Sequence, residues 1–234
     1  KQYFDLKFKQ ENIKNFIYSL YELENLNYFE NTIIKDNIIG LNVTSPYKKE
    51  IIKYLDELDD TSIKTQSVNT VFINPNTKKK TGFNTDAIGF EKLFSNCKYT
   101  KNTKGLILGS GGAAQTISFV LKKNQIEHKI VSRNPRENMI NYIDLQEFIK
   151  DAQLIINTTP LGQYPNINLF PNIPYNLISK NHICIDLIYN PKKSLFLQKA
   201  HNQGAQILNG EQMLITQAEK SWNIWKKMIQ LYNV

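Results

Sequence analysis

A glycine-rich stretch in the middle of the chain has the pattern of a dinucleotide-binding turn. It reads G-x-G-x-x-A, follows a short apolar strand and opens a predicted helix. Glycines at these positions allow a tight turn and let the backbone approach a pyrophosphate, whose charge then rests at the helix N-terminus. Such turns also serve as plain connections, so it is the strand-to-helix setting that favours dinucleotide binding here. The residues concerned are Gly109, Ser110, Gly111, Gly112, Ala113 and Ala114.

The next predicted strand ends in VSRNPR, without an acidic residue. A carboxylate at this point would receive the ribose 2′-hydroxyl of NAD and would repel the 2′-phosphate of NADP. The chain has 29 basic residues, yet only Arg133 and Arg136 are arginines, and both lie in this stretch. The guanidinium fork suits phosphate in a way that lysine does not reproduce. The sequence therefore favours NADP over NAD, against the alternative of two surface arginines that fell here by chance.

Hydride transfer to a ketone also needs a proton donor, and two polar residues at strand ends could supply and control that proton. Lys48 follows a predicted strand at residues 38–43, and Asp86 follows another at residues 81–84; each begins a predicted helix. In a parallel-type layout both would converge on one edge of the sheet, the usual place for ligands. A lysine beside a carboxylate is held in place and can still pass a proton to a substrate oxygen. The alternatives are a surface lysine and an aspartate that only caps a helix.

The elements that position Lys48 and Asp86 form an α/β unit in the first 86 residues. Alternation and apolar runs predict strands at residues 3–8, 38–43, 68–73 and 81–84. Helical spacing predicts one helix through Ile13, Phe16, Ile17 and Leu20, and a second that begins at Ser45 and Pro46 and continues to Leu58. The lysines at 78–80 fall at a predicted hairpin tip.

A different pattern of predicted strands and helices begins near residue 104. Short apolar strands are predicted at residues 105–109, 128–132, 154–158 and 183–187, with a helix at 112–121. Continuous apolar strands that alternate with helices indicate a parallel sheet covered on both faces. A long amphipathic helix begins at about Glu211 and could fold back on the elements of the first 86 residues. We therefore expect a two-domain α/β protein, with residues 1–86 and 211–234 forming a substrate domain and residues 87–210 a Rossmann domain.

Composition excludes several other classes of protein. The net charge is +8, but the lysines are scattered and no nucleic-acid-binding motif is present, so the charge fits anionic small molecules at least as well. No apolar run is long enough to span a bilayer and the first residues do not form a signal peptide, which favours a cytoplasmic location. Cys97 and Cys184 lack neighbours at metal-ligand spacing, so we expect two reduced thiols and no metal site.

Several motifs in this order and spacing resemble those of the shikimate dehydrogenase family. They are GLNVTSPYK, SVNT, GFNTDAIGF, GSGGAA, VSR, NTTPLG, DLIYNP and NGEQMLITQA, and they cover nearly the whole chain. The resemblance implies NADPH-dependent, reversible reduction of 3-dehydroshikimate to shikimate in aromatic amino-acid biosynthesis. It also implies a cleft between a substrate domain and a Rossmann domain, with the last helix returning to the substrate domain.

The resemblance implies a role for particular residues. Lys48 and Asp86 resemble the catalytic pair that holds the hydroxyl to be oxidised. The substrate contacts implied are Thr44, Asn69 and Gln217, with Asn42 and Tyr189 in supporting positions. The cofactor contacts implied are the phosphate loop Ser110 to Ala114, an adenosine-phosphate clamp of Ser132, Arg133 and Arg136, and nicotinamide surroundings of Thr159, Ile188, Gly210 and Met213. Plainer interpretations remain for Asn42 as a strand-end hydrogen bond, for Tyr189 as core packing and for Met213 as a gap filler.

One departure from the family pattern stands out. The family begins with a strand and a Ser-rich motif that binds the substrate carboxylate, and nothing here matches it, so we expect the sequence to be an incomplete record of the protein. Two other functions stay open at this level: a quinate/shikimate dehydrogenase that uses NAD, and a catalytically silent NADP-binding regulatory protein. The arginines argue against the first, and retention of Lys48 and Asp86 argues against the second.

Overall fold

The computed structural model describes residues 1–100 and 102–232. The chain forms two compact units, Lys1–Ile38 and Ile39–Val234, and both β-sheets belong to the second. None of the helices in the described ranges is long and apolar enough to cross a lipid bilayer.

The first unit is helical, with α1 (Gln2–Gln10), η1 (Leu26–Tyr28) and α2 (Phe29–Lys35). The strand predicted at residues 3–8 is therefore wrong. Phe4 and Phe8 are buried one helical turn apart, whereas Leu6 between them is 57% exposed. The spacing of Phe4 and Phe8 fits both a two-residue strand repeat and a four-residue helix repeat. The helix is further stabilised by an ion pair between Lys1 and Asp5, four residues apart and 2.8 Å long.

The helix predicted through Ile13, Phe16, Ile17 and Leu20 is also wrong, because residues 11–20 form no helix. Ile17 and Leu20, half of the expected apolar face, are 90% and 70% exposed. A short helix is marginal in water unless its apolar face is packed.

The smaller sheet of the second unit has the order β1-β3-β4-β2. Its strands are β1 (Gly40–Asn42), β2 (Glu57–Leu58), β3 (Thr70–Ile73) and β4 (Lys80–Phe83). β1 and β4 each pair antiparallel with β3, so these two strands run in the same direction, and β2 adds to β4 in parallel. Asn74 donates to the Lys79 carbonyl at the turn between β3 and β4, which confirms the lysine-rich hairpin tip.

The helix predicted from Ser45 to Leu58 is wrong in most of its length. A turn closed by Tyr47 N to Thr44 O comes first, and only η2 (Glu50–Tyr54) is helical. Leu55 is extended, and Leu58 lies in β2. Both leucines lie against Gly82 of β4, where a Cβ would come within 2.6 Å of Leu55 Cδ1. Packing on the sheet therefore overrides the helical spacing. The short helix α3 (Asp60–Thr65) follows, capped by Asp59, whose carboxylate accepts from Ser62 N.

The larger sheet is parallel throughout, with the order β10-β9-β8-β5-β6-β7. Its strands are β5 (Lys104–Leu108), β6 (Glu127–Ser132), β7 (Met139–Asn141), β8 (Leu154–Asn157), β9 (Ile183–Asp186) and β10 (Gln206–Leu208). The four predicted strands are confirmed. The edge strands β7 and β10 were not predicted. Each has only three residues, none of them buried, which is too short for a recognisable strand pattern.

Helices cover both faces of this sheet. One apolar core contains residues of α4 (Asp86–Phe94) and α5 (Gly112–Lys123). The other contains residues of α6 (Leu145–Phe148) and α7 (Leu195–Asn202), with η3 (Tyr142–Asp144) and η4 (Tyr175–Leu177) beside it. This layering confirms the predicted Rossmann-like parallel sheet.

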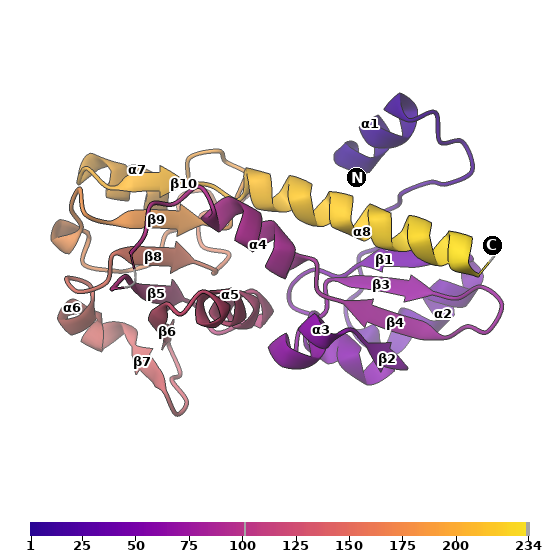
Figure 1. Cartoon of the computed structure of the whole chain (residues 1–234), viewed down its shortest axis with the longest axis horizontal. Helices are drawn as coiled ribbons and strands as arrows, with labels where there is room; N and C mark the ends of the chain where they lie inside the picture. The colour runs from indigo at the N-terminus through magenta and orange to yellow at the C-terminus, as the bar shows by residue number, and fades with distance from the viewer. Residues whose placement is uncertain (101, 233–234) are drawn as a thin grey trace. The chain divides into compact units, whose positions relative to one another are not determined.

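The last helix, α8 (Glu211–Leu231), joins the two sheets of the second unit. It packs along α4, as Figure 1 shows for the yellow helix. Near its start Met213 belongs to the core of the parallel sheet, and near its end Trp225 Nε1 donates to the Val71 carbonyl of β3. At Gly40 of β1 a Cβ would come within 2.8 Å of the Trp225 ring. The predicted return of the last helix to the elements of the first 86 residues is thus confirmed at the smaller sheet.

Candidate functional site

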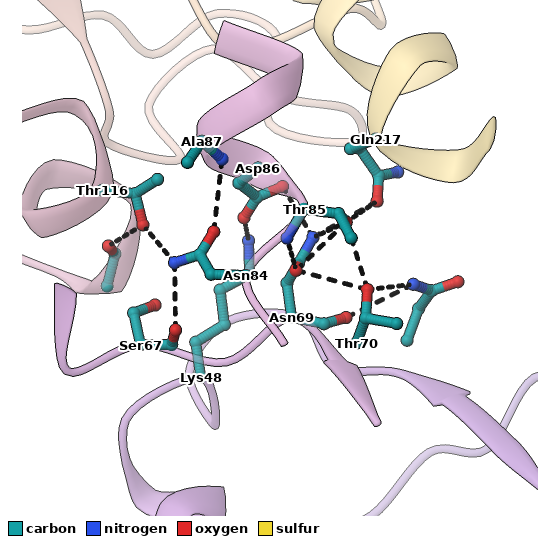
Figure 2. Close-up of polar contacts among 12 residues, drawn as sticks. Lys48, Ser67, Asn69, Thr70, Asn84, Thr85, Asp86, Ala87, Thr116 and Gln217 are labelled. Atoms are coloured by element: carbon teal, nitrogen blue, oxygen red, sulfur yellow. Dashed lines mark hydrogen bonds and ion pairs between the residues drawn. The ribbon is translucent and has the colours of Figure 1, made fainter. Parts of the chain in front are cut away.

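A lysine and an aspartate meet beside the smaller sheet. The Lys48 and Asp86 side chains point toward each other and form an ion pair (Figure 2). Lys48 Nζ lies 2.6 Å from Asp86 Oδ2, and the two side chains are only 16% and 7% exposed. Lys48 lies in the turn after β1, and Asp86 follows β4 as the first residue of α4. Since β1 and β4 run in the same direction, and each residue follows the carboxyl end of its strand, Lys48 and Asp86 lie at the same end of the sheet.

Asn69 fixes the second oxygen of Asp86. Its Nδ2 lies 2.9 Å from Asp86 Oδ1, 2.9 Å from Thr85 Oγ1 and 3.3 Å from Gln217 Oε1. Its Oδ1 accepts from the Thr85 amide at 2.7 Å. Both carboxylate oxygens of Asp86 are therefore engaged, one by an ammonium and one by an amide, and the carboxylate keeps a single orientation.

Behind Asn69 lies a network of hydroxyl groups that sequence reasoning missed. Thr70 Oγ1 lies 2.7 Å from Ser221 Oγ and 3.1 Å from Thr85 Oγ1. Asn42 Nδ2 lies 3.2 Å from Thr70 Oγ1 and 3.0 Å from Ser221 Oγ, so Asn42 contacts this network and not the Lys48–Asp86 pair. One signal was available: Ser221 follows Gln217 by four residues on α8, and residues at that spacing share a helix face.

The structure does not bring two other predicted residues into hydrogen-bond contact with the ion pair. Thr44 is exposed, and its carbonyl accepts from Tyr47 N in the turn after β1. Tyr189 is 44% exposed at the end of β9. Both side chains remain accessible to a ligand.

The glycine-rich turn fits a dinucleotide. Gly109 has φ +107°, and a Cβ there would lie 2.8 Å from Thr158 Oγ1. Gly111 precedes α5 with open space around its Cβ position, as a bound phosphate requires. At Gly112 a Cβ would lie 2.9 Å from Ser67 Oγ and 3.1 Å from Lys48 Cβ. The turn therefore lies directly against the lysine of the ion pair. Ala113 and the buried Ala114 continue into α5.

A polar link also ties α5 to the strand end that carries Asp86. Asn84 Nδ2 lies 2.9 Å from Thr116 Oγ1 on α5, from Thr65 Oγ1 and from the Ser67 carbonyl. Asn84 Oδ1 accepts from the Ala87 amide at 3.2 Å in the first turn of α4 (Figure 2). This contact was not predicted, because it joins elements far apart in the sequence.

The end of β6 lies beside the glycine-rich turn. Ser132 Oγ is 3.1 Å from Ser110 Oγ. Arg133 and Arg136 follow and are exposed. Within residues 1–100 and 102–232, no carboxylate lies within ion-pair distance of either guanidinium group. The position thus offers uncompensated positive charge to an anion.

The remaining predicted cofactor residues follow the carboxyl ends of β8, β9 and β10. Thr159 Oγ1 donates to Asn157 Oδ1 at 2.7 Å. The Gly210 amide donates to the Ile188 carbonyl at 3.1 Å, and a Cβ at Gly210 would lie only 2.0 Å from the Leu187 oxygen. Met213 is buried against Gly89 of α4, a position that also suits its plainer interpretation as a gap filler.

Asp186 at the end of β9 is a buried carboxylate that sequence reasoning missed. Asn157 Nδ2 and the Ile188 amide donate to its Oδ1, and the Ser194 hydroxyl donates to its Oδ2. Burial raises the pKa of Asp186 from 3.8 to about 6, although these three hydrogen bonds oppose the rise. Asp186 holds the strand ends that carry Thr159 and Ile188. In the described ranges no three His, Cys, Asp or Glu side chains form a metal-binding group.

Comparisons with known proteins agree with this geometry. Residues 2–71 match the family model for the shikimate dehydrogenase substrate binding domain. A shikimate dehydrogenase (NADP(+)) from Methanococcus maripaludis is 39% identical, over 90% of this chain and 81% of that protein. One from Clostridium botulinum is 38% identical, over 93% of this chain and 88% of that protein.

A solved structure of shikimate dehydrogenase 1 from Peptoclostridium difficile superposes on this one with a TM-score of 0.84. It is 30% identical and the match covers 99% of this chain and 91% of that one. Sequence identity over most of both chains, a matching fold and the paired lysine and aspartate beside a glycine-rich turn lead to one assignment. This chain belongs to the shikimate dehydrogenase family.

Proposed function

We propose that this chain catalyses the reversible, NADP-linked reduction of 3-dehydroshikimate to shikimate in aromatic amino-acid biosynthesis, with Lys48 and Asp86 as its catalytic pair. The observation that supports this most directly is the 2.6 Å ion pair of these two residues, with Gly112 of the phosphate loop against the Lys48 side chain. A proton donor and a dinucleotide turn are thereby close enough to act on the same carbonyl group.

The cofactor, when bound, supplies the hydride in the direction of reduction. In that direction Lys48 donates a proton from Nζ to the carbonyl oxygen as it becomes a hydroxyl. The neutral amine that remains keeps its hydrogen bond to Asp86 and regains a proton from solvent. In the direction of oxidation the same amine accepts the hydroxyl proton. Asp86 holds Nζ in place, and its orientation is set by Asn69.

We further propose that Asn69, Gln217 and Thr44 bind substrate hydroxyl groups. Asn69 and Gln217 already contact one another at 3.3 Å, beside the ion pair. Asn42 supports this site through Thr70, and Tyr189 forms part of its border.

The proposed cofactor site runs along the carboxyl edge of the parallel sheet. The turn Gly109 to Ala114 binds the pyrophosphate, and Ser132, Arg133 and Arg136 bind the adenosine phosphate. Thr159, Ile188, Gly210 and Met213 surround the nicotinamide. We propose residues 1–86 with 211–234 as the substrate domain and residues 87–210 as the cofactor domain.

We also propose a cytoplasmic location. Cys97 and Cys184 are buried free thiols, which suits a reducing compartment.

The test is NADP-linked oxidation of shikimate by the purified protein, followed by NADPH absorbance. Lys48→Ala should lower kcat about 10²-fold or more, the scale for loss of a positioned proton donor. Asp86→Asn should be similarly damaging, because it removes the charge that orients the lysine.

Lys53→Ala is the matched control, since Lys53 is an exposed lysine five residues after Lys48 and should leave turnover unchanged. A Lys48→Ala enzyme with normal kcat and only a raised KM would exclude Lys48 from the proton transfer. Wild-type protein that binds NADP and never oxidises shikimate would overturn the proposed function.

A further inference from the structure

The residue after the catalytic lysine takes part in a different contact. Lys48 Nζ reaches Asp86, whereas Lys49 Nζ lies 3.4 Å from the backbone carbonyl of Ser110 in the phosphate loop. Adjacent lysines thus reach the two sides of the site, one toward the substrate and one toward the cofactor. Neither the sequence motifs nor the family resemblance gave Lys49 a role.

The ammonium group of Lys49 is also affected by the positive charge of an arginine that follows β6. Lys49 is an exposed residue whose ammonium group is partly desolvated, and its pKa is lowered first by this partial desolvation and second by the positive charge of Arg136. In the part of the chain that the structure describes, no carboxylate is within ion-pair distance of Lys49, Arg133 or Arg136. Like charges gathered without a counter-ion destabilise the free protein and favour a bound anion.

The position of this charge indicates which anion. Ser110, whose carbonyl Lys49 contacts, also contacts Ser132 at the end of β6 through its hydroxyl, 3.1 Å away. The end of the second strand of a Rossmann unit is where the adenosine ribose of a dinucleotide lies. Lys49 therefore contacts a residue of the loop, Ser110, that also contacts the strand end on the ribose side.

We propose that Lys49 is a specificity-determining residue that binds the 2′-phosphate of the cofactor together with Arg136. This inference rests on the proposed function, because it assumes that the glycine-rich turn binds NADP. It adds a residue from the proposed substrate domain to a site otherwise built from the cofactor domain. The phosphate would then hold the turn after β1, which carries Lys48, against the glycine-rich loop.

The test uses two small probes, 2′,5′-ADP and 5′-AMP, which differ in the 2′-phosphate. Both are titrated calorimetrically into wild type and Lys49→Ala at one ionic strength, so that screening is constant. Loss of one charge-assisted contact should weaken 2′,5′-ADP binding about tenfold or more and leave 5′-AMP binding within about twofold. Lys49→Met should show the same selective loss, since it keeps an apolar stem in place of the lysine stem.

Lys53→Ala is again the control, because it removes an equal charge from η2 and should change neither affinity. Equal weakening of both probes by Lys49→Ala, or no weakening of 2′,5′-ADP, would overturn the assignment. The probes contain neither nicotinamide nor substrate, so their binding is measured without turnover. A protein that binds 2′,5′-ADP through Lys49 and fails to oxidise shikimate would contradict the proposed function alone.

Discussion

The buried carboxylate of Asp186 should make the stability of this protein depend on pH. Asp186→Asn retains the local hydrogen bonds, because an amide oxygen can accept from Asn157 and Ile188 and an amide nitrogen can donate to the Ser194 hydroxyl. Burial raises the pKa of Asp186 in the folded protein to about 6, from 3.8. The folded protein therefore holds this proton more tightly than the unfolded chain. Stability from this group is present at low pH and is lost as the pH rises through about 6.

The difference between the two pKa values sets the expected magnitude. It corresponds to about 3 kcal/mol of destabilisation of the wild type at neutral pH, of which about 2 kcal/mol should develop between pH 4.5 and 7.5. Asp186→Asn cannot ionise and avoids this cost. Its free energy of unfolding relative to wild type should accordingly increase by about 2 kcal/mol over that interval.

The assay is urea unfolding followed by circular dichroism, with both proteins measured at pH 4.5, 5.5, 6.5 and 7.5. All other titrating groups are common to the two proteins, so the difference between their unfolding free energies isolates Asp186. A difference that stays constant with pH would refute the reasoning, because it would mean that folding does not change the proton affinity of Asp186. A difference that grows as the pH falls would mean that folding lowers the pKa of Asp186, which is the opposite of what burial predicts.

Three further predictions concern the cofactor side of the site. Replacing Arg133 and Arg136 together by alanine should cost several kcal/mol of NADP affinity, at about 1.5 to 3 kcal/mol per charge-assisted contact, and leave NAD affinity nearly unchanged; equal losses in titrations with the two cofactors would contradict this. Gly112→Ala should lower kcat without preventing folding, because its Cβ would meet Lys48 Cβ at 3.1 Å and displace the loop or the lysine; unchanged turnover would show that the loop can move without cost. Asn84→Ala should destabilise the protein by about 1 to 3 kcal/mol, since it leaves buried partners unsatisfied, and a urea midpoint equal to that of wild type would exclude this.

Much of the site could be predicted because its signals are local. The glycine-rich turn lies within six residues, and it begins α5 as predicted. The final helix begins at Glu211 as predicted, because its apolar face repeats over 21 residues and gives a long pattern. Lys48 and Asp86 could be placed together from their positions after strand ends, but their spacing alone left a surface lysine and a capping aspartate as alternatives, and the family resemblance favoured the pair.

Other features of the structure could not be predicted, because they depend on contacts with residues that lie far away in the sequence. Phe4 and Phe8 fit two periodicities equally, and the alternative that forms is set by packing. Leu55 and Leu58 leave the helical pattern to pack on Gly82. The hydroxyl of Ser221 meets that of Thr70 across 151 residues, a distance at which no spacing rule applies.

The placement of the two tryptophans has a practical consequence. Trp222 and Trp225, the only tryptophans in the sequence, are buried on the same helix, and the indole of Trp225 donates to the backbone of β3. All tryptophan emission therefore originates from α8. Release of this helix from β3 would expose Trp225 to water and shift the emission to longer wavelength. Reduced nicotinamide absorbs where tryptophan emits, so energy transfer from α8 should report the arrival of NADPH, and the chain carries an optical probe of its last helix without any label.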